Sequence, residues 1–183
     1  MNNGEKDTRV QVPTQAWVTA FAIMNIDETL QNTPNISLRE YIDIQKEKTN
    51  VWRNNPDISI YNDGFLFMMA YAFLVVPKES IARLNLNISC SSIDIILQKM
   101  TIRKNKKQHD LGESENIIRH IRNSISHADF NIDDERNITF IDQHQGEVTF
   151  NGEMGINEFK SLIAEYFNIF YKCYHQKYIA GKA

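Results

Sequence analysis

The sequence predicts an all-α protein, a helical bundle with one small β-hairpin between the last two helices. Apolar residues recur at helical spacing through most of the 183 residues. One run of β-branched and aromatic residues, punctuated by Gly, lies late in the chain. We expect a single domain over residues 1–183, with the hairpin at about 137–152 as an insert.

The first half of the chain predicts two amphipathic helices before a loop. One follows Pro13, where Trp17, Phe21 and Met24 are spaced at helical intervals. A second begins at Ser37, because a Ser followed three residues later by Glu is the capping-box pattern that starts a helix. The loop is predicted at residues 54–57, where Asn, Pro and Asp cluster.

An apolar run at residues 65–76 predicts a third helix, beginning near Asn62 or Asp63 and closed by Pro77. The run is well short of the roughly 20 residues that span a bilayer, so we interpret it as a buried helix and expect no membrane contact. Because it is apolar on all sides, other helices or a partner subunit should cover it.

The second half predicts two further helices, the hairpin and a long final helix. Their expected ranges are 93–100 and 113–130 for the helices, 137–142 and 146–152 for the hairpin arms, and 157–179 for the last helix. Between the first two lies the one dense basic patch, residues 103–107, which includes Lys104, Lys106 and Lys107. Such a patch is either a solvated loop or a contact for a phosphate backbone.

Charge and cysteine content restrict the setting. The net charge of −3 gives no overall positive field, so any contact with nucleic acid must be local. Cys90 and Cys173 lie far apart and form no CxxC pair, as in a reduced intracellular protein. The polar first residues lack the apolar stretch of a signal peptide, and we expect a cytoplasmic protein.

Common catalytic motifs are missing from the sequence. It has no phosphate-binding GxxxxGK[ST], no GxGxxG, no HExxH and no GxSxG. None of the five histidines forms an i,i+4 pair, which argues against a zinc site on a helix. We therefore expect neither a metal nor a cofactor.

The predicted helix at 113–130 separates its residues into two faces. One arc of about 100° is apolar and should face the core, and the opposite face is polar. The apolar positions are Ile117, Ile118, Ile121, Ile125 and Ala128, and the polar ones are Arg119, His120, Arg122, Asn123, Ser126 and His127. Arg122 and His127 are roughly 140° apart around the axis, so a substrate must lie across the helix or a second copy must supply one of them.

This polar face suits RNA cleavage through the 2′-hydroxyl. That reaction needs a base that titrates near neutrality, as histidine does, and a fixed positive charge on the phosphoryl oxygens, as arginine provides. Structural interpretations remain open beside it. His127 near a helix C-terminus is stabilised by the helix dipole when protonated, and Arg122 could pair with Glu115 or Asp129.

The segment Arg122-Asn123-Ser-Ile-Ser-His127 resembles the R-N-x-x-x-H form of the motif of the HEPN superfamily (higher eukaryotes and prokaryotes nucleotide-binding). The Ile-rich helix around it, the hairpin and the long last helix are similar to small bacterial HEPN proteins over about residues 90–179. Over the first ninety residues the resemblance consists only of helices that are compatible with such a protein.

The resemblance implies a helical bundle that forms a homodimer through the motif helix. It also implies a metal-independent endoribonuclease, of the kind found in toxin–antitoxin, CRISPR and phage-defence systems. By motif position, Arg122 and His127 would be catalytic and Asn123 would support them. Asp129 stands where some of these toxins carry a Tyr that a partner nucleotidyltransferase modifies, which argues against that regulation here.

The leading hypothesis is thus a dimeric ribonuclease, with an RNA substrate and an antitoxin or sensor protein as possible partner. Besides the three motif residues, we expect six residues to bind RNA: Arg119, His120, Ser126, Lys104, Lys106 and Lys107. The alternative is a non-catalytic module of the same type that binds RNA, nucleotide or protein. A third possibility is a structural helical protein that carries the motif by chance.

Overall fold

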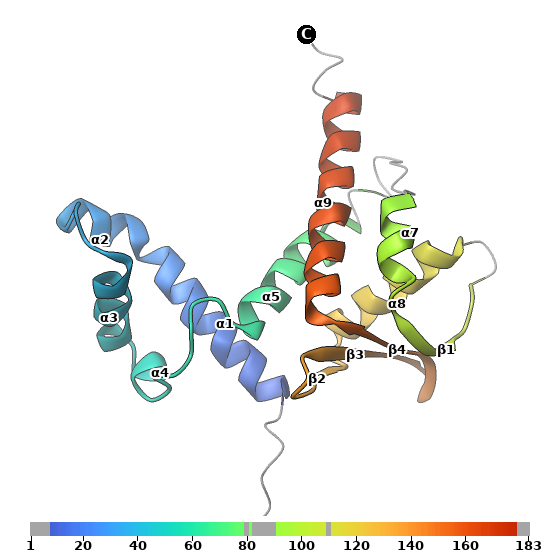
Figure 1. Cartoon of the computed structure of the whole chain (residues 1–183), viewed down its shortest axis with the longest axis horizontal. Helices are drawn as coiled ribbons and strands as arrows, with labels where there is room; N and C mark the ends of the chain where they lie inside the picture. The colour runs from blue at the N-terminus through green and yellow to red at the C-terminus, as the bar shows by residue number, and fades with distance from the viewer. Residues whose placement is uncertain (1–7, 79–80, 82–90, 109–110, 179–183) are drawn as a thin grey trace, which may run out of the picture. The chain divides into compact units, whose positions relative to one another are not determined.

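The computed structural model describes residues 8–78, 81, 91–108 and 111–178 (Figure 1). The chain divides into two compact units, Met1–Met68 and Met69–Ala183, and passes from one to the other within helix α5 (Asp63–Ala70). The predicted single domain over 1–183 stays a prediction. Cys90 lies outside the described residues, and Cys173 is half-buried in the last helix.

The first unit consists of short helices around a small apolar core. These are α1 (Thr8–Met24), α2 (Ile26–Asn32), α3 (Leu38–Lys48), α4 (Asn50–Arg53) and the start of α5. Val18, Ala22, Tyr41 and Trp52 form the core. The predicted capping box is confirmed, since the Ser37 side chain accepts from the backbone N–H of Glu40 and the Glu40 carboxylate accepts from that of Ser37.

The apolar run at 65–76 forms α5 and then a π-helical turn, Tyr71–Val75. Ala70 and Leu74 are fully buried, but Tyr71 and Val76 are 51% and 56% exposed. In the single chain the run is therefore not covered on every side, and cover by a partner subunit stays a prediction. No helix in the described part of the chain combines the length and the apolar character needed to cross a membrane.

The second unit corrects the predicted all-α fold, because it is built on a four-stranded antiparallel sheet. The strands are β1 (Thr101–Asn105), β2 (Phe130–Ile132), β3 (Asn137–His144) and β4 (Glu147–Gly155), in the order β1-β4-β3-β2. The predicted hairpin is confirmed as β3 and β4. The two outer strands were missed: the basic patch was expected as a loop, and Phe130 was expected to end a helix.

Among the residues that the structure describes, the α-helices that accompany the sheet are α7 (Ser91–Leu97), α8 (Glu113–Ser126) and α9 (Ile156–Tyr178). Figure 1 shows α8 and α9 on the same side of the sheet. Strand alternation turns Ile138, Phe140 and Asp142 of β3 toward that side, where all three are buried. The ring of Phe140 lies 5.1 Å from that of Phe159 in α9, which joins the last helix to the centre of the sheet.

Helix α8 ends earlier than predicted because Ala128 adopts a left-handed backbone conformation, with φ of 55°. The N–H of Ala128 donates to the carbonyl of Ile125, and the N–H of Asp129 donates to that of Ser124. This pair of bonds is the Schellman motif, which usually has Gly at the left-handed position. The turn redirects the chain into β2 and leaves His127 as the last residue against the helix.

We expect Ala128→Gly to stabilise the second unit, because glycine adopts the left-handed conformation without the steric cost that an L side chain carries. The free energy of unfolding should rise by about 1 kcal/mol, measured by equilibrium urea unfolding. Ala164→Gly, on an exposed position inside α9, is the matched control and should lower it by about 1 kcal/mol. Equal losses in both variants would contradict a left-handed Ala128.

Candidate active site on helix α8

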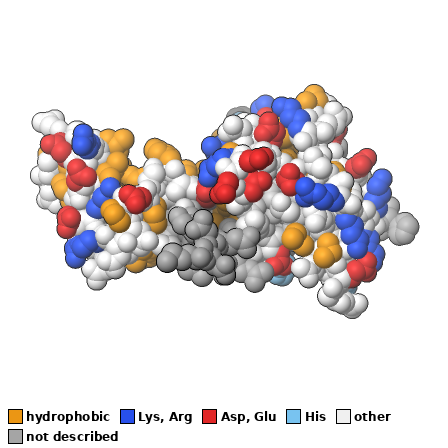
Figure 2. Space-filling model, turned by 60° about the horizontal axis from the view of Figure 1, so that its bottom comes forward, with side chains coloured by type: hydrophobic (Ala, Val, Ile, Leu, Met, Phe, Trp, Pro, Cys, Tyr) orange, Lys and Arg blue, Asp and Glu red, His pale blue; other side chains and the backbone are white. Residues whose placement is uncertain are grey.

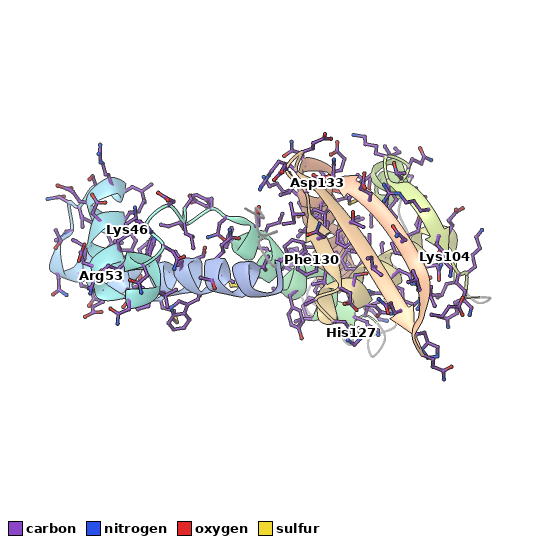
Figure 3. The ribbon with its side chains drawn as sticks, turned by 90° about the horizontal axis from the view of Figure 1, so that it is seen from below. Lys46, Arg53, Lys104, His127, Phe130 and Asp133 are labelled. Atoms are coloured by element: carbon purple, nitrogen blue, oxygen red, sulfur yellow. The ribbon has the colours of Figure 1, made fainter. Side chains whose placement is uncertain are left out.

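Helix α8 crosses the sheet on the side where α9 also lies, and it runs from the β1 edge toward the β2 edge. Near its start, the Asn116 amide donates to the Asn105 side-chain oxygen of β1 at 2.7 Å. At its end, His127 precedes the turn into β2. Figure 3 shows His127 and Lys104 at opposite margins of the sheet. The polar residues of α8 therefore lie in two different surroundings, one near the β1 edge of the sheet and one near the β2 edge.

His120 needs the main correction among the predicted site residues. It was placed on the exposed polar face and expected to contact RNA, but it is fully buried. Its ring stacks on Phe150 of β4, with centroids 4.8 Å apart and planes 7° apart. Its Nδ1 lies 2.7 Å from Oδ2 of Asp142, the residue directly opposite Phe150 in the β3–β4 ladder. The sheet thus supplies a stacking ring and a hydrogen-bond acceptor for this imidazole.

Three groups contact the ring nitrogens of His120: the Arg119 guanidinium, the Asp142 carboxylate and the Lys106 carbonyl. Its Nε2 lies 2.8 Å from Nη2 of Arg119, and a guanidinium can only donate. Nε2 also lies 3.2 Å from the carbonyl oxygen of Lys106, which can only accept. Nδ1 faces the Asp142 carboxylate, the acceptor for its N–H. Asp142 Oδ2 also accepts from Nδ2 of Asn123 at 3.0 Å and lies 4.0 Å from Nη1 of Arg119. One carboxylate oxygen thus receives donors from two turns of α8.

Arg122 points away from this cluster, toward helix α9. Its Nη1 donates to the hydroxyl oxygen of Tyr166 at 3.3 Å, and its Nε is buried without a hydrogen-bond partner among the described residues. Burial raises the pKa of Tyr166, while the positive charge of Arg122 lowers it and Glu115 raises it. The guanidinium is half-buried, with one edge held by a phenol.

His127 and Ser126 lie at the exposed end of the helix. The Ser126 hydroxyl donates to the carbonyl of Arg122, and the backbone N–H of His127 donates to that of Asn123. His127 is thus held by its backbone at the helix C-terminus, while its side chain is solvent-accessible. The two motif residues have different environments: a half-buried guanidinium and an exposed imidazole five residues later.

The basic patch covers the end of β1 and the two residues after it, and its charges are partly neutralised. Lys104 and Lys106 lie 3.4 Å and 3.5 Å from the carboxylate of Glu147, which begins β4, and Lys107 is exposed. The hydrogen bond from Lys104 and the charge of Lys106 lower the pKa of Glu147. On the face drawn in Figure 2, Lys and Arg side chains stand beside Asp and Glu rather than forming a continuous positive surface.

Sequence reasoning missed two residues that contact the motif, Asp142 and Tyr166. A signal existed for Asp142: it occupies an inward position in the alternation of β3, after Ile138 and Phe140, and a charged residue there requires a buried partner. Tyr166 has no such signal, because it falls in the apolar stripe of the last helix. Within the described ranges, no group of three or more His, Cys, Asp or Glu side chains could hold a metal ion.

The fold and the site together define a mixed helix-and-sheet protein that presents an Arg-Asn-x-x-x-His helix over an antiparallel sheet. The family model described as HEPN pEK499 p136 matches residues 1–177, so the chain belongs to this HEPN family. The match includes the first unit as well as the second, although the motif resemblance extended only over the second half. No curated protein and no solved structure shows significant similarity to the chain.

We expect Arg122→Gln to raise the pKa of Tyr166 further, because the guanidinium charge that favours the phenolate is lost. Since the folded-state pKa is already raised, the contribution of Tyr166 to stability is present at neutral pH and is lost as the pH rises through that pKa. Tyrosinate absorbance during alkaline titration, compared with Tyr166→Phe to isolate this residue, measures the change. Arg53→Gln in the first unit is the control, and an unchanged titration of Tyr166 would contradict the contact.

Proposed function

We propose that the chain is a metal-independent endoribonuclease in which Arg122 and His127 are the catalytic residues. The observation that carries this proposal is the arrangement of the motif in a member of a HEPN family. Arg122 is anchored beside Tyr166, and the His127 imidazole is exposed at the end of the same helix. A fixed cation and an accessible base are the two groups that cleavage by the 2′-hydroxyl requires.

In the proposed reaction, His127 accepts the proton of the 2′-hydroxyl, and the resulting oxygen attacks the adjacent phosphorus. The P–O5′ bond breaks, which leaves a 2′,3′-cyclic phosphate on one fragment. The departing 5′ oxygen takes a proton from the His127 imidazolium or from water. Arg122 stabilises the negative charge that builds on the phosphoryl oxygens in the transition state.

The proposed active form is a homodimer through α8. His127 lies five positions after Arg122, so the two side chains diverge around the helix. Two facing copies would place the arginine of one near the histidine of the other. Arg119 and Ser126, together with Lys104, Lys106 and Lys107, would hold the RNA backbone. The proposed setting is a cytoplasmic toxin–antitoxin or phage-defence system, with an antitoxin or sensor protein as partner.

One observation favours the alternative function, a non-catalytic module that binds RNA, nucleotide or protein. The Arg122 guanidinium is already bonded to Tyr166, and its Nε is buried. An arginine used in this way can join α8 to α9 without acting on a phosphate. The two functions differ in how substitution of Arg122 and His127 changes RNA cleavage.

With EDTA present, we expect the purified chain to cleave RNA and Arg122→Ala and His127→Ala to abolish most of that activity. The loss should be about 100-fold or more for each, since each removes a main catalytic contribution. His144→Ala, an exposed histidine at the end of β3, and Arg53→Ala are matched controls that should retain full activity. Circular dichroism establishes that all five proteins are folded.

The pattern across the five proteins distinguishes the functions. Equal cleavage in all of them would identify a contaminating nuclease. RNA binding by the parent without cleavage, lost in Arg122→Ala, would support the binding module. A cleavage product that lacks the 2′,3′-cyclic phosphate would contradict the proposed use of the 2′-hydroxyl.

We expect Glu147→Gln to strengthen RNA binding and to steepen its dependence on salt. The substitution removes the carboxylate that pairs with Lys104 and Lys106, so two more ammonium groups are free for phosphates. Fluorescence anisotropy with a labelled RNA over a series of salt concentrations measures both effects.

Glu135→Gln is the matched control for that experiment. It makes the same change in net charge in the connection between β2 and β3, at the other end of strand β3. If both variants strengthen binding equally, total charge explains the effect, and Lys104 and Lys106 are not the RNA contact.

A further inference from the structure

The Asn123 amide has a defined orientation because of the group it meets. Its contact with the sheet is with Oδ2 of Asp142, at 3.0 Å. The same oxygen lies 2.7 Å from Nδ1 of His120 and 4.0 Å from Nη1 of Arg119, so it is an acceptor surrounded by donors. The NH2 group of Asn123 must therefore face Asp142, and its amide oxygen must face away.

Burial makes this orientation specific. Asp142 is 5% exposed, and His120, which contacts the same carboxylate oxygen as Asn123, is fully buried. A buried carboxylate that lost the Asn123 donor would lose part of its compensation, so a flipped amide is disfavoured. A β-bulge at Asp142 and Gln143 sets the strand here, and the Thr149 hydroxyl donates to the Asp142 carbonyl.

From this geometry we infer that Asp142 is a positioning residue for the reaction, holding Asn123 so that its amide oxygen, an acceptor, is presented at the motif. This inference rests on the proposed ribonuclease function and adds a residue from the sheet to it. A presented acceptor suits a group that has a hydrogen to give, such as an imidazole N–H or a ribose hydroxyl. Asn123 would then act on the base and nucleophile side of the reaction, and phosphate oxygens would be left to Arg122.

A double-mutant cycle on RNA cleavage tests whether Asp142 acts through Asn123. Asp142→Ala frees the amide to rotate, and we expect kcat to fall about 10- to 100-fold with KM little changed. In the Asn123→Ala background the same substitution should cost nothing further. A purely structural role would lower kcat in both backgrounds by the same factor, since it does not depend on the amide.

A second pair of variants keeps the test valid where Asp142→Ala does not fold. Asn123→Asp sets two carboxylates side by side and should lower kcat at least tenfold. Adding Asp142→Asn restores a donor–acceptor pair in the opposite sense. The new NH2 group takes the place of Oδ2 and donates one hydrogen to residue 123 and the other to Nδ1 of His120, whose proton is then on Nε2, beside the Lys106 carbonyl oxygen. We expect the double variant to recover most of that loss.

The outcomes separate this inference from the function on which it rests. If the parent chain cleaves no RNA, the proposed function fails and the positioning role fails with it. If the parent cleaves RNA but the losses from Asp142→Ala and Asn123→Ala multiply, or the exchanged pair recovers nothing while folded, the inference alone is overturned. Non-additive losses with recovery in the exchanged pair would support it.

Discussion

The second unit depends on one buried carboxylate. Asp142 projects from β3 into the layer between the sheet and α8, where an ionised oxygen is costly unless donors surround it. The donors come from the helix: the imidazole of His120 and the amide of Asn123, with the guanidinium of Arg119 further out. Because these groups satisfy one another, the helix has one rotation about its axis and one position along the strand in which the cluster is complete.

That constraint links the sheet to the motif. The hairpin could have been a separate insert, but its two strands build the pocket for His120, one with an acceptor and the other with a stacking ring. On the far side of α8, Tyr166 of α9 engages Arg122. Consecutive motif residues are thus held by different elements, Arg122 by the last helix and Asn123 by the sheet. Among the described residues, His127 is held only by its backbone hydrogen bond to Asn123.

Structural features that are caused by residues close together in the sequence could be predicted, and features that depend on distant contacts could not. The capping box at Ser37, the arms of the hairpin and the last helix follow from neighbouring residues, and the family resemblance follows from six residues in a row. The edge strands could not be predicted from neighbouring residues. β1 is exposed and basic, and it gains its strand geometry only by pairing with β4. The end of α8 was missed because alanine gives no sign of a left-handed turn.

The candidate site shows the same division. Helical periodicity placed Arg122, Asn123 and Ser126 on the polar side of α8, but it also placed His120 there. Helical periodicity assigns every polar residue to the solvent-facing side. It cannot show that His120 has a partner, Asp142, on a strand 22 residues away in sequence. The inward Asp142 and the polar His120 are each anomalous by themselves, and only pairing them across the structure explains both.

The period-two geometry of β3 has a consequence for chains of varied length. An added or deleted residue within β3, between its start and Asp142, would turn that carboxylate to the outer side of the sheet and put its neighbour into the helix-facing layer. The connection between β2 and β3 carries no such restriction, because exposed residues there precede the first paired position. Length variation in related chains should accordingly collect in that connection and be absent from the five residues before Asp142.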